Sequence, residues 1–347
     1  MKSSSDTYSH ATHRMEVEEF DALFSHLNAG GRMERLAWVR EWTGVSLAGR
    51  VMNVFIRMAQ GMPYHTLEVM TGIDRGQLCR DFERMVPFLE EVMVRDFIRL
   101  PNEAECAELR GSPGPDFLGD CVAVVDATNL KVRKMCASDE GNYYNADKKM
   151  HSIKVQIATL WSGEVVNLAY HGMKLRDGST FEAPGRGADW GLFLRTFLRT
   201  WILSHGGNCK LLADAGYMSR CNNEGDSFNT LVVPLSLKRV RTIGKDARER
   251  NRNISRPRVV VEGTIGWVKQ AWTLLDVAEE NTDLFLQGKV FAIGAAAMNF
   301  LCRRRGRFLR DMNWARGARS AWEVGVDYDD IMNKTDSQAF RRAEFDI

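Results

Sequence analysis

The sequence lacks the residue patterns of disulfide frameworks, zinc sites and membrane-spanning segments. Seven cysteines are spread over 347 residues without a CxxC pair, which favours free thiols in a reducing compartment over a disulfide framework. The seven histidines form no HExxH motif, so a zinc site of His and Cys has little support. No run reaches about 18 consecutive apolar residues, and the N-terminus lacks the apolar core of a secretory signal. We therefore expect no membrane segment and no zinc- or disulfide-dependent fold.

The charge of the chain is nearly balanced. The 47 basic and 45 acidic residues leave a formal net charge of +2, so the total says nothing about a nucleic-acid partner and the distribution matters more. Hydrophobic residues make up 44% and charged residues 27%, which is typical of globular proteins and excludes collagen, coiled-coil and wholly disordered classes. At roughly 150 residues per domain, the length predicts about two domains.

The first hundred residues favour a helical region behind a loose start. Residues 1–32 are polar, and we expect them to be partly disordered. Over residues 33–100, apolar residues recur at helical spacing. Within this region, residues 61–84 have the pattern of a short helix, a Gly-containing turn and a longer helix that Asp74 can cap. This layout is typical of a helix-turn-helix motif.

The second helix of this motif is predicted to have one apolar and one polar side. The residues on its apolar side are Leu78, Phe82 and Met85. The candidate DNA-reading residues on its polar side are Arg75, Gln77, Arg80 and Arg84. Recognition helices read base edges with side chains of these types. An ordinary helical hairpin with exposed arginines has the same pattern, so both interpretations stay open.

A change of pattern near residue 120 marks a second region. Residues 101–119 are rich in Pro and Gly, and we expect a linker there. Over residues 120–310, short apolar strands, one hairpin signal and helices alternate, which predicts an α/β domain with a mixed sheet. Residues 311–347 lack strong periodicity and are predicted to form a peripheral tail.

Three of the 45 acidic residues stand out by their placement. Asp126 and Asp214 each end a short apolar strand, where a carboxylate either faces a crevice or forms an ordinary turn. Glu262 lies one turn into a predicted helix, on the same face as Arg258 and Lys269. Taken alone, that face is a solvated salt-bridge surface. Three converging carboxylates could instead hold two Mg²⁺ ions, because Mg²⁺ prefers oxygen ligands.

The blocks around these acids resemble the signature blocks of the DDE transposases. The first two blocks are Asp126-Ala127-Thr128 and Asp214-Ala215-Gly216-Tyr217. The third block is Arg258-x-x-Val261-Glu262, followed by Gly266 and Lys269. Between the first two, the stretch that resembles the family's "YY…KKxHxxKxQ" motif comprises Tyr143-Tyr144, Lys148-Lys149, His151, Lys154 and Gln156. The type that the chain resembles, over about residues 50–300, is the Harbinger (PIF) group with its bacterial insertion-sequence relatives.

This resemblance implies an RNase H-like catalytic core behind the helix-turn-helix region. Asp126, Asp214 and Glu262 would be the catalytic residues and would bind two Mg²⁺ ions, which Mn²⁺ could replace. The implied activity cleaves phosphodiester bonds at element ends and transfers the 3′-hydroxyl to target DNA. Other implied properties are a homo-oligomer on double-stranded DNA, a separate Myb-like DNA-binding partner as is common for Harbinger elements, and a nuclear location in a eukaryote or a cytoplasmic and nucleoid one in a bacterium.

Two positions depart from the family pattern. The family often has "PGSxHD" after the hairpin, where this chain has residues 171–179, and Asp177 is the candidate to replace that Asp. In the related bacterial signature a Tyr precedes the Arg by three positions, and here that position is Ser255. Neither departure touches the three carboxylates, although both bear on subfamily and activity.

Basic residues lie close in sequence to these blocks. One segment begins with Lys238, Arg239 and Arg241 and ends at Arg258, next to the helix of Glu262. A second group, from the stretch between the first two acids, comprises Lys148, Lys149, His151 and Lys154. Together with Lys269, we predict that these residues contact DNA phosphates, which gives salt-sensitive binding. A solvated charged loop is the alternative for the first segment, and a structural hydrogen bond is the alternative for His151.

Two further functions remain compatible with the sequence. A domesticated DNA-binding protein would keep the fold without catalysis, although it would not need three metal-binding carboxylates. A nuclease without strand transfer would keep the carboxylates and lose the second chemical step. Terminal inverted repeats beside the gene would distinguish a mobile element from both.

Overall fold

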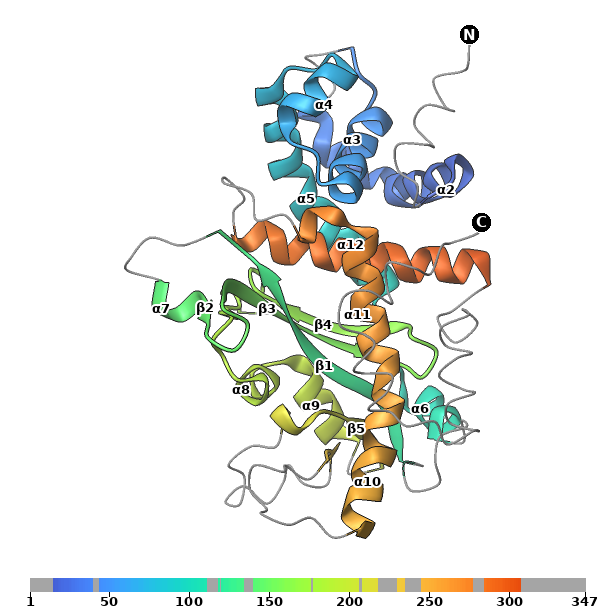
Figure 1. The fold of residues 1–347 in the computed structure, drawn as a ribbon. Helices are drawn as coiled ribbons and strands as arrows, with labels where there is room; N and C mark the ends of the chain where they lie inside the picture. The colour runs from blue at the N-terminus through green and yellow to red at the C-terminus, as the bar shows by residue number, and fades with distance from the viewer. Residues whose placement is uncertain are drawn as a thin grey trace.

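The part of the chain after residue 120 folds into a twisted sheet with helices on both faces, and a helical region lies above this sheet (Figure 1). The computed structural model describes residues 15–39, 44–110, 118, 120–133, 140–175, 177–205, 208–217, 230–234, 245–276 and 284–306. The peripheral tail predicted over residues 311–347 lies outside these ranges.

The helical region consists of α2 (Val17–Asn28), η1 (Ala29–Val39), α3 (Leu47–Gln60), α4 (Tyr64–Thr71) and α5 (Arg75–Phe97). Gly61 and Gly72 end α3 and α4 in the left-handed conformation that glycine adopts without strain. The Asp74 side chain accepts the N–H of Gln77 at 3.1 Å, which confirms the predicted cap of α5. Within the segment predicted to be polar and partly disordered over residues 1–32, residues 17–28 form α2 and bury Phe20, Leu23 and Leu27.

The sheet follows the order β2-β3-β1-β5-β6, and β4 also pairs with β3, outside this order. Its strands are β1 (Cys121–Lys131), β2 (Tyr144–Asn145), β3 (Met150–Thr159), β4 (Val165–Tyr170), β5 (Lys210–Leu212) and β6 (Leu231–Val232). β3 is antiparallel to β1 and β4, whereas β5 is parallel to β1 and β6. This mixed sheet behind a helical region confirms the predicted α/β class and is consistent with an RNase H-like core.

Two hydrophobic clusters cover the two faces of the sheet. On one face, Val124 and Ile157 pack with residues of α11 (Val259–Ala271) and α12 (Leu284–Arg305). On the other face, Val125 and Ala158 pack with residues of α8 (Asp189–Leu194) and α9 (Phe197–Ser204). The alternation of side chains along β1 and β3 therefore sends neighbouring residues to different layers.

Helix α12 lies between the helical region and the sheet and contacts both (Figure 1). The Asn299 side chain donates to the carbonyl of Phe97 at the end of α5 and to the carbonyl of Val165 at the start of β4, at 2.9 and 2.7 Å. By length and composition α12 could cross a membrane, but 78% of its apolar window is buried inside the fold, as in a core helix. The helical region and the sheet thus share one core.

Three elements differ from the sequence-based expectations. The segment predicted as a linker contains α6 (Glu103–Arg110). The basic segment before Glu262, expected as a connection, contains α10 (Lys245–Ser255) and the 3-10 turn η4 (Arg256–Arg258). Helices α10 and α11 run almost end to end, and α10 projects past the edge of the sheet (Figure 1). Finally, β1 does not end at Asp126, because its pairing with β3 continues to Lys131.

Candidate active site

Asp126 lies in the middle of the central strand β1. β1 pairs with β3 on one side, where Asp126 faces Ile157 across the ladder, and with β5 on the other. Asp126 is two residues after Val124, so its side chain leaves the sheet on the face that α11 covers. Because the ladder to β3 continues through Asp126 to Lys131, the backbone of this carboxylate is held within the sheet.

Asp214 approaches Asp126 from the segment that follows the neighbouring strand β5. In the parallel β1–β5 pair, Val124 stands opposite Leu212, so Asp126 and Asp214 each follow this pair by two residues. Adjacent strands are about 4.8 Å apart, which places the two carboxylates side by side. The Asp214 carboxylate accepts the N–H of Gly216 at 2.6 Å in the turn that follows β5.

Glu262 reaches these two acids from α11 through a shared arginine. The Nη2 atom of Arg258 lies 3.2 Å from Glu262 Oε1, 3.6 Å from Asp126 Oδ2 and 4.0 Å from Asp214 Oδ2. Arg258 and Glu262 are four residues apart, so one helical turn brings both to the sheet. The structure thus brings the three predicted catalytic carboxylates together around one cation.

The electrostatics of this cluster favour a positive charge at its centre. Burial raises the pKa of Asp126 to about 7, and the nearby charges of Asp214 and Glu262 act in the same direction while Arg258 opposes them. Burial also raises the pKa of Glu262, again against the effect of Arg258. Since one guanidinium faces three carboxylates, additional positive charge would stabilise their ionised forms.

The carboxylate oxygens of this cluster suit a hard divalent cation, but in this structure they are arranged around the guanidinium of Arg258. Carboxylate oxygens are the ligands that Mg²⁺ and Mn²⁺ prefer. The Arg258 guanidinium acts as a stand-in cation at the point where the three side chains converge. In the described part of the chain, no group of three or more His, Cys, Asp or Glu side chains is arranged to hold a metal ion as it stands. Asp126, Asp214 and Glu262 are the residues that could hold one after Arg258 moves.

Lys269 lies on α11 two turns after Glu262, and its side chain is bonded within the protein. Its Nζ donates to the carbonyl of Asn129 in β1 at 2.8 Å. Burial lowers the pKa of this amine. Lys269 therefore ties α11 to β1 in this structure, in addition to the DNA-contacting role predicted from the sequence.

The residues of the predicted "KKxHxxKxQ" stretch separate into two groups. Lys148 and Lys149 are exposed in the turn between β2 and β3, where Lys149 has a positive φ of 51°. The half-buried His151 ring lies 5.3 Å from the ring of Tyr144. Lys154 is buried, forms an ion pair with Asp189, and lies on the face of β3 opposite to Asp126. In this structure Lys154 is thus not a surface residue of the carboxylate cluster.

Asp189 is a fourth acidic residue near the site, which the sequence analysis missed. A Cβ atom on Gly216 would lie 2.8 Å from Asp214 Oδ1 and 3.1 Å from Asp189 Oδ2, so both carboxylates line one spot. Asp177, the residue suggested to replace the family's Asp, is instead exposed and accepts hydrogen bonds from Ser179. The spacing Pro184-Gly185-x-x-x-Asp189 was the signal, because it matches that of "PGSxHD".

The predicted DNA-reading residues of α5 lie on its first turns. Arg75, Arg80 and Arg84 are exposed, as predicted for the polar side, and Leu78, Phe82 and Met85 are buried. Gln77 is engaged within the helix: its amide donates to Asp81 at 2.6 Å and accepts from Arg80 at 3.1 Å. Asp81 in turn forms a buried ion pair with Arg50 of α3. The side chain of Gln77 is therefore held by hydrogen bonds to Asp81 and Arg80.

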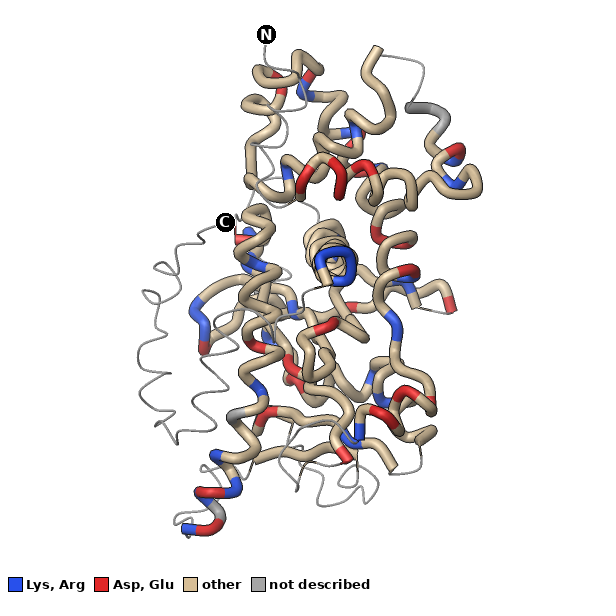
Figure 2. Tube along the Cα trace, turned by 90° about the vertical axis from the view of Figure 1, so that its right-hand side faces the viewer, with Lys and Arg blue, Asp and Glu red and all other residues tan. Residues whose placement is uncertain are grey.

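The basic segment before Glu262 is described only in part. Lys238, Arg239 and Arg241 lie outside the described residues. Along α10, basic residues Lys245, Arg248, Arg250 and Arg252 are exposed, and Asp246 and Glu249 alternate with them (Figure 2). This helix leads directly into η4 and α11, and so into the carboxylate cluster.

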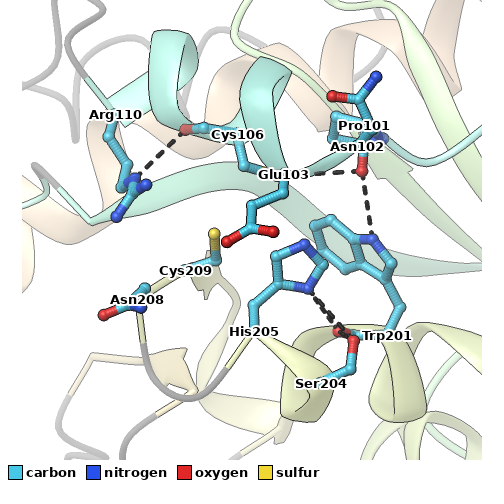
Figure 3. Close-up of a pocket in the computed structure, with 10 residues that line it drawn as sticks. All are labelled: Pro101, Asn102, Glu103, Cys106, Arg110, Trp201, Ser204, His205, Asn208 and Cys209. Carbon is cyan, nitrogen blue, oxygen red and sulfur yellow. Dashed lines mark hydrogen bonds between the residues drawn. The ribbon is translucent and has the colours of Figure 1, made fainter.

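A separate cavity of about 500 Å³ lies between α6 and α9 (Figure 3). The Glu103 carboxylate and the His205 ring point into it, and Trp201 Nε1 donates to the carbonyl of Pro101 at 3.3 Å. Burial raises the pKa of the Cys106 thiol to about 12, which disfavours thiolate chemistry there. The lining contains none of the residues predicted to bind DNA or metal.

One protein-family model matches the α/β part of the chain. Residues 125–285 match the family model described as "DDE superfamily endonuclease", a range that includes Asp126, Asp214 and Glu262. The searches of curated proteins and of solved structures gave no match. The α/β part of the chain is thus similar to the DDE superfamily of transposases and nucleases, and the match does not extend to the Harbinger group within it or to the helical region.

Proposed function

We propose that this chain is a metal-dependent DNA transposase or endonuclease of the DDE type. The observation that carries this proposal is the convergence of Asp126, Asp214 and Glu262 on one cation, within the range that matches the endonuclease family. A DNA-binding protein without catalysis needs no such cluster of partly buried, mutually repelling carboxylates. Keeping them together costs stability, which a catalytic role explains.

Asp126, Asp214 and Glu262 would hold the metal, with Mg²⁺ as the physiological ion and Mn²⁺ as a substitute. Two bound ions would activate the attacking water or hydroxyl and stabilise the leaving oxygen of the phosphodiester. Asp126 would be the least mobile of the three carboxylates, because its backbone is part of the ladder between β1 and β3. Glu262 and Arg258 approach from a helix. The same arrangement serves hydrolysis at an element end and transfer of the resulting 3′-hydroxyl to target DNA, since both are displacements at phosphorus.

Double-stranded DNA is the proposed substrate, and two surfaces of the chain suit it. One is the exposed arginine side of α5, with Arg75, Arg80 and Arg84. The other is the set of exposed basic side chains on α10, the helix that leads into the carboxylate cluster. Lys148 and Lys149 add exposed positive charge in the turn between β2 and β3. The family resemblance adds a homo-oligomer that holds two DNA ends, a Myb-like partner protein, and a nuclear location if the host is a eukaryote.

Plasmid cleavage with Mg²⁺ or Mn²⁺ tests this function. We would compare the wild type with Asp126→Asn and Glu262→Gln at low and moderate salt. Asp177→Asn is the matched control, because Asp177 is an exposed carboxylate bonded to Ser179 and outside the cluster. We expect the wild type and the control to cut, and the two cluster variants to lose cleavage while they keep DNA binding.

Two results would contradict the proposal in different ways. Cleavage by the cluster variants at the wild-type rate would show that these carboxylates are not catalytic. If no protein cuts either plasmid or DNA carrying the ends of its own element, yet all bind with the same salt dependence, the chain is a domesticated DNA-binding protein. Cleavage without joining of the 3′-hydroxyl to a second DNA would identify a nuclease without strand transfer.

A further inference from the structure

Arg258 is surrounded by the three carboxylates of the candidate active site, which is an unusual position for a residue that binds substrate. A single atom, Nη2, lies within 4.0 Å of carboxylate oxygens of Glu262, Asp126 and Asp214. The side chain is only 13% exposed. It therefore sits where the three carboxylates converge, and it is not extended into solvent toward a substrate.

The contacts of Arg258 are numerous but loose. The three separations of 3.2–4.0 Å exceed the roughly 2.7–2.9 Å of charge-assisted hydrogen bonds. Among the described residues, the buried Nε of Arg258 has no hydrogen-bond partner. An unsatisfied buried donor is unfavourable, so this conformation is held mainly by charge attraction and not by directional bonds. A compact cation of higher charge could replace the guanidinium.

We propose that Arg258 is a built-in counter-ion that fills the metal position of the metal-free protein and has to move aside when a divalent cation binds. The inference rests on the proposed function, because it concerns the same carboxylates. Residue 258 ends η4 and precedes the first turn of α11, at the junction with the projecting helix α10. Its side chain can therefore leave the cluster by rotation, while Glu262 stays on α11. Once displaced, the guanidinium is free to pair with an anionic phosphate oxygen.

This arrangement makes Arg258 a competitor of the metal ion. The carboxylate cluster binds metal only in the fraction of molecules whose Arg258 has left it, so the apparent affinity falls by that fraction. If the side chain is displaced in about one molecule in ten, removing it tightens metal binding on the order of tenfold. A structural or purely DNA-binding arginine would leave metal affinity unchanged, or would weaken it when removed.

Titration of the metal-free full chain with Mn²⁺ tests the inference, with free Mn²⁺ followed by electron paramagnetic resonance. The variants are Arg258→Gln and Arg258→Lys, and Asp126→Asn locates the binding site. Arg252→Gln is the matched control, because it removes one exposed positive charge from α10 near the cluster. We expect Arg258→Gln to lower the Kd for Mn²⁺ about tenfold, Arg258→Lys to fall between it and the wild type, and Arg252→Gln to stay within about twofold.

The outcomes separate this inference from the proposed function. If the wild type binds Mn²⁺, Asp126→Asn does not, and Arg258→Gln binds no more tightly than the wild type, the counter-ion role is wrong and the metal site stands. If neither the wild type nor Arg258→Gln binds Mn²⁺, the proposed metal site fails and the counter-ion role fails with it. Binding by Arg258→Gln that is no tighter than that of Arg252→Gln also overturns the inference.

A second measurement uses only the wild type, in case Arg258→Gln does not fold. Phenylglyoxal modifies accessible arginines, and peptide mapping reports the extent at each position. We expect Arg258 to be protected without metal and to react several-fold faster with saturating Mg²⁺, while exposed Arg252 reacts equally in both conditions. Equal protection of Arg258 with and without bound Mg²⁺ would contradict the displacement.

Discussion

Replacing Gly288 with alanine tests how closely α12 packs on the edge of the sheet. A Cβ atom at this position would lie 2.2 Å from the carbonyl oxygen of His171 and 3.2 Å from a ring atom of Tyr170. Both neighbours are buried, and the closer one is backbone at the end of β4. Relief of the contact would require α12 and this backbone to separate by roughly an ångström, since non-bonded carbon and oxygen atoms rarely approach much below about 3.2 Å.

The expected effect is a net loss of stability. Alanine gains about 1 kcal/mol over glycine in a helix interior. Overpacking a tight core costs about 1–3 kcal/mol, and a backbone contact belongs at the upper end of that range or above it. We therefore expect Gly288→Ala to lower the free energy of unfolding by about 2 kcal/mol, measured by urea denaturation followed by circular dichroism.

Gly266 provides the matched control on α11. It is also inside a helix, but a Cβ atom there would have no neighbour within 4 Å. Gly266→Ala should therefore raise the free energy of unfolding by about 0.5–1 kcal/mol. If Gly288→Ala proves as stable as Gly266→Ala, α12 does not pack on β4 as described. If both variants lose the same stability, the loss is unrelated to the contact with His171.

Two further predictions concern charged side chains of the helical region. Asp81→Ala should lower the free energy of unfolding by about 3–5 kcal/mol, because it leaves Arg50 buried without this carboxylate. The double variant Arg50→Met/Asp81→Leu should recover most of this loss. Urea denaturation of the single and double variants checks the prediction, and additive losses would contradict it. Burial would raise the pKa of Asp96, but hydrogen bonds from Arg95 and Arg32 outweigh it and hold the pKa at about 2. The ionised Asp96 therefore adds about 1 kcal/mol to the free energy of unfolding after solvent screening. This contribution is complete above about pH 4 and is lost as the pH falls toward 2. Asp96→Asn should therefore make the free energy of unfolding depend less on pH between about pH 4 and 2.

The strands show what a hydrophobic pattern can and cannot predict. The run from Val122 to Val125 predicts the buried half of β1 because all four residues are apolar. The half after Asp126 was missed, since the small Ala127 and the polar Thr128 and Asn129 are only partly buried and interrupt the apolar run. Their extended conformation depends on the ladder to β3, a pairing between segments that lie far apart in the sequence.

Prediction of the site followed the same division between local and long-range information. The shared face of Arg258 and Glu262 follows from helical spacing alone. The approach of Arg258 to Asp126 and Asp214 does not, because it depends on how α11 packs across the sheet. Lys154 illustrates the opposite case: it was predicted to contact DNA as part of the stretch that resembles the family motif, but the α8 layer covers its face of the sheet and Asp189 provides the partner.

The four charged groups at the centre of the site differ in how far they can adjust. Asp126 is held by the ladder between β1 and β3, and Asp214 by the N–H of Gly216 in the turn after β5. Glu262 and Arg258 are held mainly by each other and by the register of α11. Any rearrangement on binding a metal ion or a phosphodiester is therefore expected on the helical side of the cluster. Because α10 continues from this point into the surface proposed to contact DNA, binding of DNA along α10 and departure of Arg258 from the carboxylates would act on the same short segment, and each would favour the other.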